Sequence, residues 1–261
     1  MNYKHIAQQI IEANEISNFW HQKPVPNIVV DNFLPKSLAK EIEVEAQNYK
    51  TFIPTNDYMF GKNKFGSHDL DSIGKGMSAL KGLLVSEIFA AALSQVFGQK
   101  VFVDNHFIGG GLHRGGKGSY LDMHVDFKKH PSEEWIRELN VLYFLNPEWK
   151  KAFGGALKLE NSETGKCGEI EPLFNRLVIM HTSDYTYHGY STIDFPDGRF
   201  RTSIAAYSYR LPMPGEDITS RRTTTIWRPS SKFRSLVAMI TPALVQAKQK
   251  VFGSRTARQK K

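Results

Sequence analysis

The strongest constraint on the fold of this chain is a succession of short strand-like segments that begins at residue 101. Apolar and β-branched residues recur in short runs, and each run is bounded by Gly, Pro, Asn or Asp. The runs are Val101–Ile108, Tyr120–Val125, Leu139–Leu145, Ala156–Leu159, Glu169–Glu171, Leu177–His181 and Thr202–Tyr209. Many short strands at this spacing are typical of a β-sandwich or a β-barrel.

The first hundred residues predict helices instead. Helical spacing of apolar residues predicts helices over Tyr3–Ala13, Pro35–Ala46 and Ser78–Phe97. Gly98 follows the third of these segments as a C-cap. A short strand is expected within Pro26–Pro35, and the polar, glycine-containing segment Asn56–Asp71 predicts a loop. Helices followed by strands favour an α+β fold over a doubly wound sheet.

The positive charge of the chain is concentrated at its C-terminal end. Residues 218–261 contain 11 Lys and Arg and no Asp or Glu, whereas residues 1–217 contain 23 basic and 26 acidic residues. We therefore predict an N-terminal helical part over 1–100, a strand core over 101–217 and a basic extension over 218–261. The acidic body argues against a specific nucleic-acid partner.

The basic extension admits three interpretations. Its apolar residues follow an approximately helical stripe, which suits an amphipathic segment lying on an anionic membrane surface. A solvated extension and a basic arm for another partner are the alternatives. We expect Trp227 to pack on the body and the catalytic domain to end near Pro229.

Cysteine content and hydropathy limit the cellular context. The single cysteine, Cys167, excludes an intrachain disulfide framework and a cysteine-based metal site. The N-terminal residues contain no apolar core of a secretory signal. The longest apolar run, Leu236–Val245, is interrupted and falls short of the roughly 20 residues that a membrane span needs. We expect a cytoplasmic protein whose extension is the candidate for peripheral membrane contact.

Four residues in the strand region carry the chemistry. His124 and Asp126 are two positions apart, so a strand would present both side chains on one face. His188 follows 62 residues after Asp126, a separation that a curled sheet can close. Two histidines and one carboxylate form the facial triad of non-haem iron sites, although a surface His–Asp pair is the alternative here. Arg201 begins a strand that also presents Ser203 on the same face. An arginine that points into a barrel is costly to bury unless it binds an anion.

Several sequence blocks in order resemble one known family. The blocks are GGGLHRGGKGSYLDMHVDF, RELNVLYFLNPEW, FGGALKLEN, GEIEPLFNRLVIMHTSDYTYHGY and RTSIAAYSY. This stretch, Gly109 to Arg210, resembles the Fe(II)/2-oxoglutarate dioxygenase superfamily in its prolyl 4-hydroxylase-like branch. The resemblance implies a double-stranded β-helix (jelly-roll) core with the N-terminal helices packed against it. It also implies Fe(II), 2-oxoglutarate and O2, with ascorbate as a candidate reductant.

The resemblance assigns roles to matching positions. His124, Asp126 and His188 match the iron ligands, and Arg201 matches the residue that binds the 5-carboxylate of 2-oxoglutarate. Phe144 stands where the oxygen-sensing prolyl hydroxylases have a tyrosine, and Ser203 could replace the lost hydroxyl. For three further residues the matching positions leave alternatives open. Asn140 contacts the co-substrate or substrate, or caps a neighbouring backbone group. Leu157 is expected to line the pocket, with a place in the core as the alternative. His113 is expected on the surface, with a position facing the co-substrate as the alternative.

The activity implied is a hydroxylase for a peptidyl proline, an amino acid or another small metabolite, coupled to decarboxylation of 2-oxoglutarate to succinate. Asp126 argues against a halogenase, which has a small residue there. Tyr207 stands where nucleic-acid dealkylases have a second arginine, which argues against that activity. A non-catalytic β-sandwich binding module and a cupin-type isomerase or lyase are the alternatives from other classes. Substrate choice is expected to lie in the segments Asn56–Asp71 and Lys128–Arg137.

Overall fold

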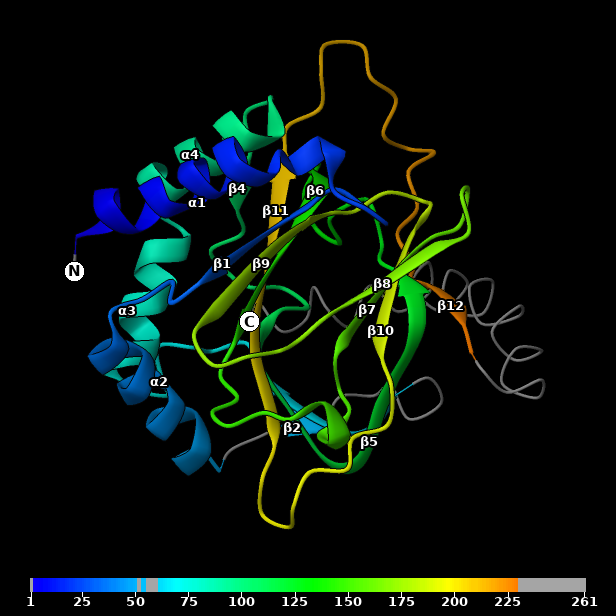
Figure 1. Cartoon of the computed structure of the whole chain (residues 1–261). Coiled ribbons are helices and arrows are strands. Elements are labelled where there is room, and N and C mark those ends of the chain that lie inside the picture. Colours follow the sequence, from blue (N-terminus) through cyan, green and yellow to red (C-terminus); the bar gives the residue numbers. More distant parts are fainter. Residues whose placement is uncertain (1, 51–52, 55–60, 230–261) are drawn as a thin grey trace.

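A curled antiparallel sheet forms the centre of the molecule, and helices cover one side of it (Figure 1). The structure is a computed structural model that describes residues 2–50, 53–54 and 61–229. The helices are α1 Tyr3–Ser17, α2 Lys36–Asn48, α3 Lys75–Leu84 and α4 Glu87–Phe97. The strands are β1 Asn27–Asp31, β2 Ile53–Pro54, β3 Gly61–Ser67, β4 Phe102–Val103, β5 Gly111–Val125, β6 Ile136–Phe144, β7 Leu157–Asn161, β8 Lys166–Ile170, β9 Arg176–His181, β10 Thr186–Tyr190, β11 Arg201–Arg210 and β12 Ile226–Arg228.

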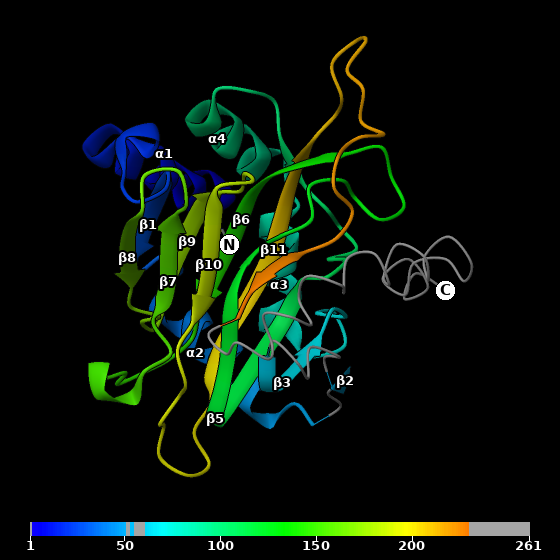
Figure 2. The same cartoon turned by 90° about the vertical axis from the view of Figure 1, so that its right-hand side faces the viewer.

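The order of the strands explains the curl. The main path through the sheet runs β1-β9-β6-β11-β5-β10-β7-β8. Leu157 and Leu159 of β7 pack with Val178 and Met180 of β9, so the two ends of this path approach each other across a small core. Figure 2 shows β10, β7 and β8 facing the strands that carry the helices. This arrangement confirms the predicted α+β fold with a jelly-roll core.

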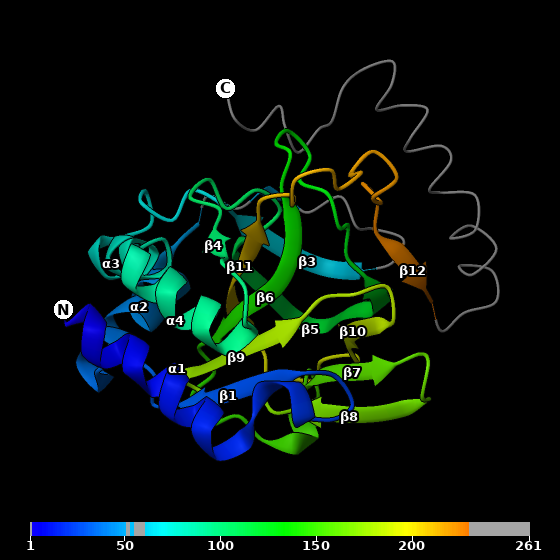
Figure 3. The same ribbon diagram turned by 90° about the horizontal axis from the view of Figure 1, so that it is seen from above.

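The two faces of β6 illustrate how alternation builds the core. Leu139, Val141 and Tyr143 point to the helical side, where they join a large apolar cluster with all four helices. Their neighbours Leu142 and Phe144 point to the inside of the curl. Seen from above, the helices gather on one side of the sheet, so the opposite face is left to form a cavity (Figure 3).

The third predicted helix is two helices in the structure. The chain breaks at Val85 and Ser86, and the Ser86 hydroxyl accepts a hydrogen bond from the Phe89 backbone N–H, which caps α4. Gly98 ends α4 in the left-handed conformation, as predicted. Within the described residues no single helix is long and apolar enough to cross a membrane; only α3 and α4 together, across a 48° bend, have that length and composition.

Glycine-rich composition concealed the longest strand. The sequence predicts turns over Gly109–Gly118, but residues 111–118 belong to β5, so that prediction is wrong. Gly111 has a φ of 102°, and a Cβ there would lie 2.1 Å from the carbonyl oxygen of Ser67 on β3. The glycine is therefore required by the close approach of a neighbouring strand.

Polar composition likewise concealed β3. Residues 61–67 of the predicted loop Asn56–Asp71 form this strand and pair with β5, whereas residues 56–60 lie outside the described residues. The run Val101–Ile108 is a strand only over β4, because the Asp104 carboxylate accepts hydrogen bonds from the backbone of His106 and Ile108 and turns the chain. Strand β10 was not predicted, because its sequence, TYHGY, has few apolar residues.

The segment before Pro229 joins the sheet. Strand β12 pairs with β5 opposite Met123–Val125, which confirms that the residues around Trp227 pack on the body. The stripe predicted to contact a membrane lies beyond residue 229, outside the described residues. The three predicted parts of the chain stay predictions.

Asn175 ties the helical layer to the sheet and provides a test of the fold. Its side chain accepts hydrogen bonds from the Leu34 backbone N–H and the Tyr143 hydroxyl, at 2.9 and 2.8 Å, and donates to the Leu34 carbonyl at 2.7 Å. Its φ of 60° is also one that Asn tolerates. Because three buried bonds are lost, Asn175→Ala should destabilise the fold by about 3 kcal/mol, and Tyr143→Phe by about 1 kcal/mol. Denaturant unfolding measures both, and equal losses would contradict this role.

Candidate active site

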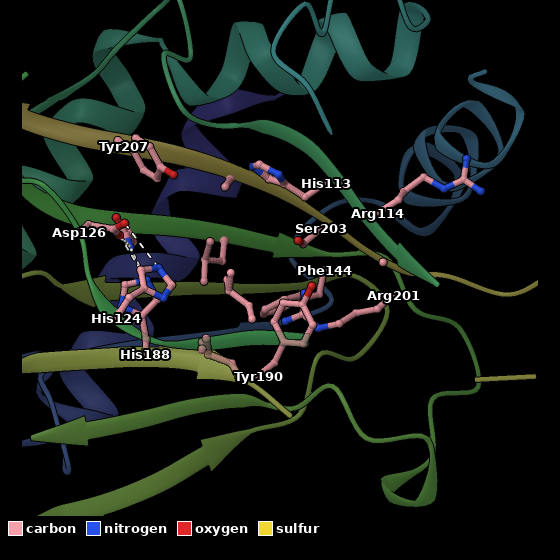
Figure 4. A pocket seen from close by; sticks show the side chains of 17 residues that line it. His113, Arg114, His124, Asp126, Phe144, His188, Tyr190, Arg201, Ser203 and Tyr207 are labelled. Carbon is pink, nitrogen blue, oxygen red and sulfur yellow. Dashed lines mark hydrogen bonds and ion pairs between the residues drawn. The ribbon is translucent and has the colours of Figure 1, made fainter. Parts of the chain in front are cut away.

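Two histidines face each other across neighbouring strands inside the curl. His124 of β5 and His188 of β10 are directly opposed partners, and their ring centroids lie 4.2 Å apart (Figure 4). The pairing shifts register between His188 and Tyr190, and Gly189 lies at this irregularity. A Cβ on Gly189 would lie 2.6 Å from the carbonyl oxygen of Leu121, so the close approach of the two strands depends on glycine.

Asp126 completes a cluster that could hold a metal ion. It follows the last residue of β5, and its Oδ2 lies 3.2 Å from Nε2 of His188 while its Oδ1 lies 3.6 Å from Nε2 of His124. One ligand atom from each residue lies within 4.8 Å of the others. Nδ1 of His124 lies 2.9 Å from the Asp122 carbonyl oxygen, to which it donates when protonated. That bond leaves Nε2 as the metal-binding atom, so the donor set fits a divalent metal.

Charge inside this cluster is compensated by an arginine that sequence analysis missed. Nη2 of Arg137 donates to Oδ2 of Asp126 at 2.8 Å, and the side chain of Arg137 is fully buried. Burial alone would raise the pKa of Asp126, but the Arg137 cation and the two histidines outweigh it and hold the pKa well below the ordinary value. Asp126 is therefore a carboxylate and can act as an anionic ligand.

Arg137 was missed because the strand alternation is broken beside it. The sequence analysis placed residue 137 at the end of a loop, but β6 begins at Ile136. The register with β11 skips Glu138, so Arg137 faces the same side as Asn140. Asn140 lines the cavity, and its amide donates to Oδ2 of Asp126 at 2.9 Å rather than to a neighbouring backbone group; its predicted contact with the co-substrate or substrate stays a prediction.

Arg201 lies at the other end of the cavity. Its Nε donates to the Gly155 carbonyl at 2.6 Å, and its guanidinium lies over the rings of Tyr190 and Phe144, at 4.3 and 5.1 Å. Burial lowers the pKa of Arg201 to about 10. No acidic side chain among the described residues forms an ion pair with Arg201, so its charge faces the cavity without a protein anion.

Hydroxyl groups flank Arg201. Ser203 is buried and lines the cavity, as the alternation along β11 predicts. Tyr190, which the sequence analysis did not single out, is also buried there, and its hydroxyl lies 3.1 Å from Oγ of Ser119. The available signal was its position two residues after the candidate ligand His188.

The cavity between the His–Asp cluster and Arg201 is lined by both apolar and polar side chains. Leu157 lines it as predicted, with Leu121, Leu142 and Tyr207. His113 was expected on the surface, but it is half-buried and lines the cavity, because the unpredicted part of β5 carries it inward. Figure 4 shows Ser203 and His113 between the His–Asp cluster and Arg201.

The C-terminal segment closes one side of the cluster. The indole of Trp227 stacks on the ring of His124, with centroids 4.7 Å apart and planes inclined by 30°. Arg222 donates to the backbone carbonyl of Asp126 at 2.7 Å. Two proposed ligands are thus held by residues beyond the predicted strand core.

Comparison with known proteins gives one family match and several structures of similar fold. Residues 110–209 match the 2OG-Fe(II) oxygenase superfamily. Nothing among the curated proteins matches the chain. A prolyl-4-hydroxylase from Pseudomonas putida superposes with a TM-score of 0.57 at 14% identity, covering 79% of this chain and 99% of that protein.

Two further structures share the fold. A Trichoplax adhaerens prolyl hydroxylase, in complex with a peptide fragment of the hypoxia inducible factor oxygen degradation domain, has a TM-score of 0.52 at 17% identity, covering 79% of this chain and 90% of its own. HygX from Streptomyces hygroscopicus, with nickel, 2-oxoglutarate and hygromycin B bound, has a TM-score of 0.53 at 11% identity, covering 77% and 87%.

The dependence of the cluster on Gly189 is testable. Gly189→Ala should destabilise the protein by roughly 1–3 kcal/mol and weaken Mn(II) binding, because its Cβ would push β10 away from β5. Gly116→Ala is a matched control on β5, where a Cβ would meet only Phe200 at 3.4 Å. Thermal unfolding and titration calorimetry measure both effects. Equal behaviour of the two variants would show that the close approach at Gly189 is not required.

Proposed function

The chain belongs to the 2OG-Fe(II) oxygenase superfamily, and we propose that it is a hydroxylase in which His124, Asp126 and His188 bind the iron. The observation that carries the proposal is the placement of this cluster and of Arg201 at opposite ends of one cavity. Arg201 is buried and forms no ion pair with an acidic side chain of the described residues. The protein is an oxygenase that uses Fe(II) and 2-oxoglutarate. A non-catalytic binding module would have no need for both features in one cavity.

Different residues of the cavity bind the metal and the co-substrate. His124, Asp126 and His188 hold the metal through two imidazole nitrogens and one carboxylate oxygen, which leaves positions open for the co-substrate. Arg201 binds the distal carboxylate of 2-oxoglutarate with its planar guanidinium. Bound iron and 2-oxoglutarate supply the oxidising power, with O2 consumed and succinate and CO2 formed. The apolar walls keep bulk water from the reacting atoms.

A hydroxyl group beside Arg201 completes the carboxylate site. Phe144 lacks the hydroxyl that the resembling enzymes have at this position, and the structure offers two replacements, Ser203 and Tyr190. Tyr190 packs under the guanidinium itself, and its hydroxyl already lies within hydrogen-bond distance of Ser119. We assign the second donor to Tyr190, with Ser203 as the alternative.

The substrate is a peptidyl prolyl or amino-acid residue or another small metabolite. The Trichoplax adhaerens enzyme holds a peptide fragment and HygX holds hygromycin B, so both kinds of ligand suit this fold. Contact of residues 218–261 with an anionic membrane surface, and a cytoplasmic location, are parts of the same proposal.

The co-substrate site predicts a graded response to substitution. Arg201→Ala should raise the dissociation constant for 2-oxoglutarate at least about 30-fold, because truncating a buried charge pair costs about 2–5 kcal/mol. Tyr190→Phe should raise it several-fold and Ser203→Ala should not. Titration calorimetry on the Mn(II)-loaded protein measures all three. The reverse ranking of the two hydroxyl variants would assign the donor to Ser203, and unchanged binding by Arg201→Ala would refute the carboxylate site.

The activity is tested by succinate release and a mass gain of one oxygen, with proline-containing peptides, free amino acids and small polar metabolites as substrates. The wild-type protein with Fe(II) should form succinate from 2-oxoglutarate, and His188→Ala should lose nearly all of this turnover because one ligand is missing. His106→Ala is the matched control, since His106 is exposed and outside the cavity. Turnover that persists in His188→Ala, or none by the wild-type protein, would contradict the proposal.

A further inference from the structure

We propose that Arg137 is a positioning residue for the iron site: together with Asn140 it holds Oδ2 of Asp126, so that the carboxylate offers the metal its other oxygen, Oδ1. The inference rests on the proposed function, in which Asp126 is an iron ligand. It gives a role to Arg137, a fully buried arginine to which the family resemblance assigns no part in binding iron or 2-oxoglutarate.

The contacts around Asp126 distinguish its two oxygens. Oδ2 accepts a hydrogen bond from Nη2 of Arg137 at 2.8 Å and another from the Asn140 amide at 2.9 Å. Nε of Arg137 donates to Oδ1 of the Asn140 side chain at 3.0 Å, which fixes the amide with its nitrogen toward Asp126. Oδ2 also lies 3.2 Å from Nε2 of His188, whereas Oδ1 lies 3.6 Å from Nε2 of His124. An oxygen that already accepts two hydrogen bonds, one from a cation, is the weaker donor to a metal, so Oδ1 is the ligand atom.

Arg137 is itself held rigidly. Its guanidinium carbon lies 3.3 Å from the ring centroid of Tyr207 and 4.8 Å from that of Phe127. The Tyr207 hydroxyl donates to the Gly109 carbonyl at 2.8 Å, which keeps the ring in place. Nη1 of Arg137 has no hydrogen-bond partner among the described residues, and a cation that faces an aromatic ring tolerates this. The arginine therefore reaches Asp126 in one geometry.

Stability alone does not account for this arrangement. A buried ion pair often stabilises a fold no better than apolar side chains of the same volume. Holding one ligand oxygen in place does account for it, because partners of metal ligands commonly fix their orientation. A carboxylate that binds through one oxygen also occupies one metal position instead of two, which keeps three of six positions open in a facial triad.

The test uses Co(II) binding, which requires no turnover. The wild-type protein is titrated with Co(II), and its dissociation constant and visible absorption bands are recorded. Arg137→Met should raise the dissociation constant about 10- to 100-fold and change the bands, because the carboxylate is free to turn. Arg137→Lys should recover part of the affinity, since a lysine keeps the charge but cannot also bond Asn140.

Two further variants make the test decisive. Arg114→Met removes another buried arginine, whose guanidinium bonds the Ala46 carbonyl at the end of α2, and should leave Co(II) affinity unchanged within about twofold. Asn140→Ala, with a smaller expected loss of about tenfold, decides the question if neither Arg137 variant folds. Thermal unfolding without metal reports the folded fraction of each variant.

The outcomes separate the two proposals. Failure of the wild-type protein to bind Co(II) would overturn the iron site and with it the proposed function. Binding by the wild-type protein, with the same dissociation constant and bands in folded Arg137→Met, would overturn the positioning role alone. If that variant does not fold, unchanged binding by Asn140→Ala would do so.

Discussion

The pairing of β5 with β10 is the constraint on which the candidate site depends. Backbone hydrogen bonds between these strands set His188 opposite His124, and the chain reaches Asp126 directly after β5 ends. The close approach is possible because Gly189 brings no side chain against the Leu121 carbonyl. A metal site built from rigid strands keeps its geometry better than one built from loops.

The half-buried Asp126 and the buried Arg201, at opposite ends of the cavity, differ in the partners that the protein gives them. Asp126 has Arg137 and Asn140 as partners within the protein, so its charge is compensated before any ligand binds. Arg201 has aromatic rings and one backbone carbonyl as neighbours, and no protein anion among the described residues. A desolvated cation left in this state favours an anionic ligand. In the proposed function, the distal carboxylate of 2-oxoglutarate would supply the charge compensation at this end of the cavity.

The segment beyond the predicted strand core contributes to the same site. Trp227 covers one face of the His124 imidazole, and Arg222 binds the Asp126 carbonyl. Helices support the site from the other side, where the apolar face of β6 packs on them. The candidate metal site is thus supported by elements from both ends of the chain. These elements lie outside the matched residues 110–209.

The local pattern of apolar and polar residues in the sequence determined many of the strands and helices and the faces on which their side chains lie. Strand alternation placed Arg201, Ser203 and Tyr207 on one face, and the spacing of His124 and Asp126 placed both on another, because residues two apart in a strand share a face. The helical spacing of the N-terminal apolar residues predicted that layer. The tertiary structure alone decided which strands pair and where alternation breaks. Arg137 turned inward because of a bulge at Glu138, and β3 and the glycine-rich part of β5 are strands through long-range pairing, since their composition has no strand preference of its own.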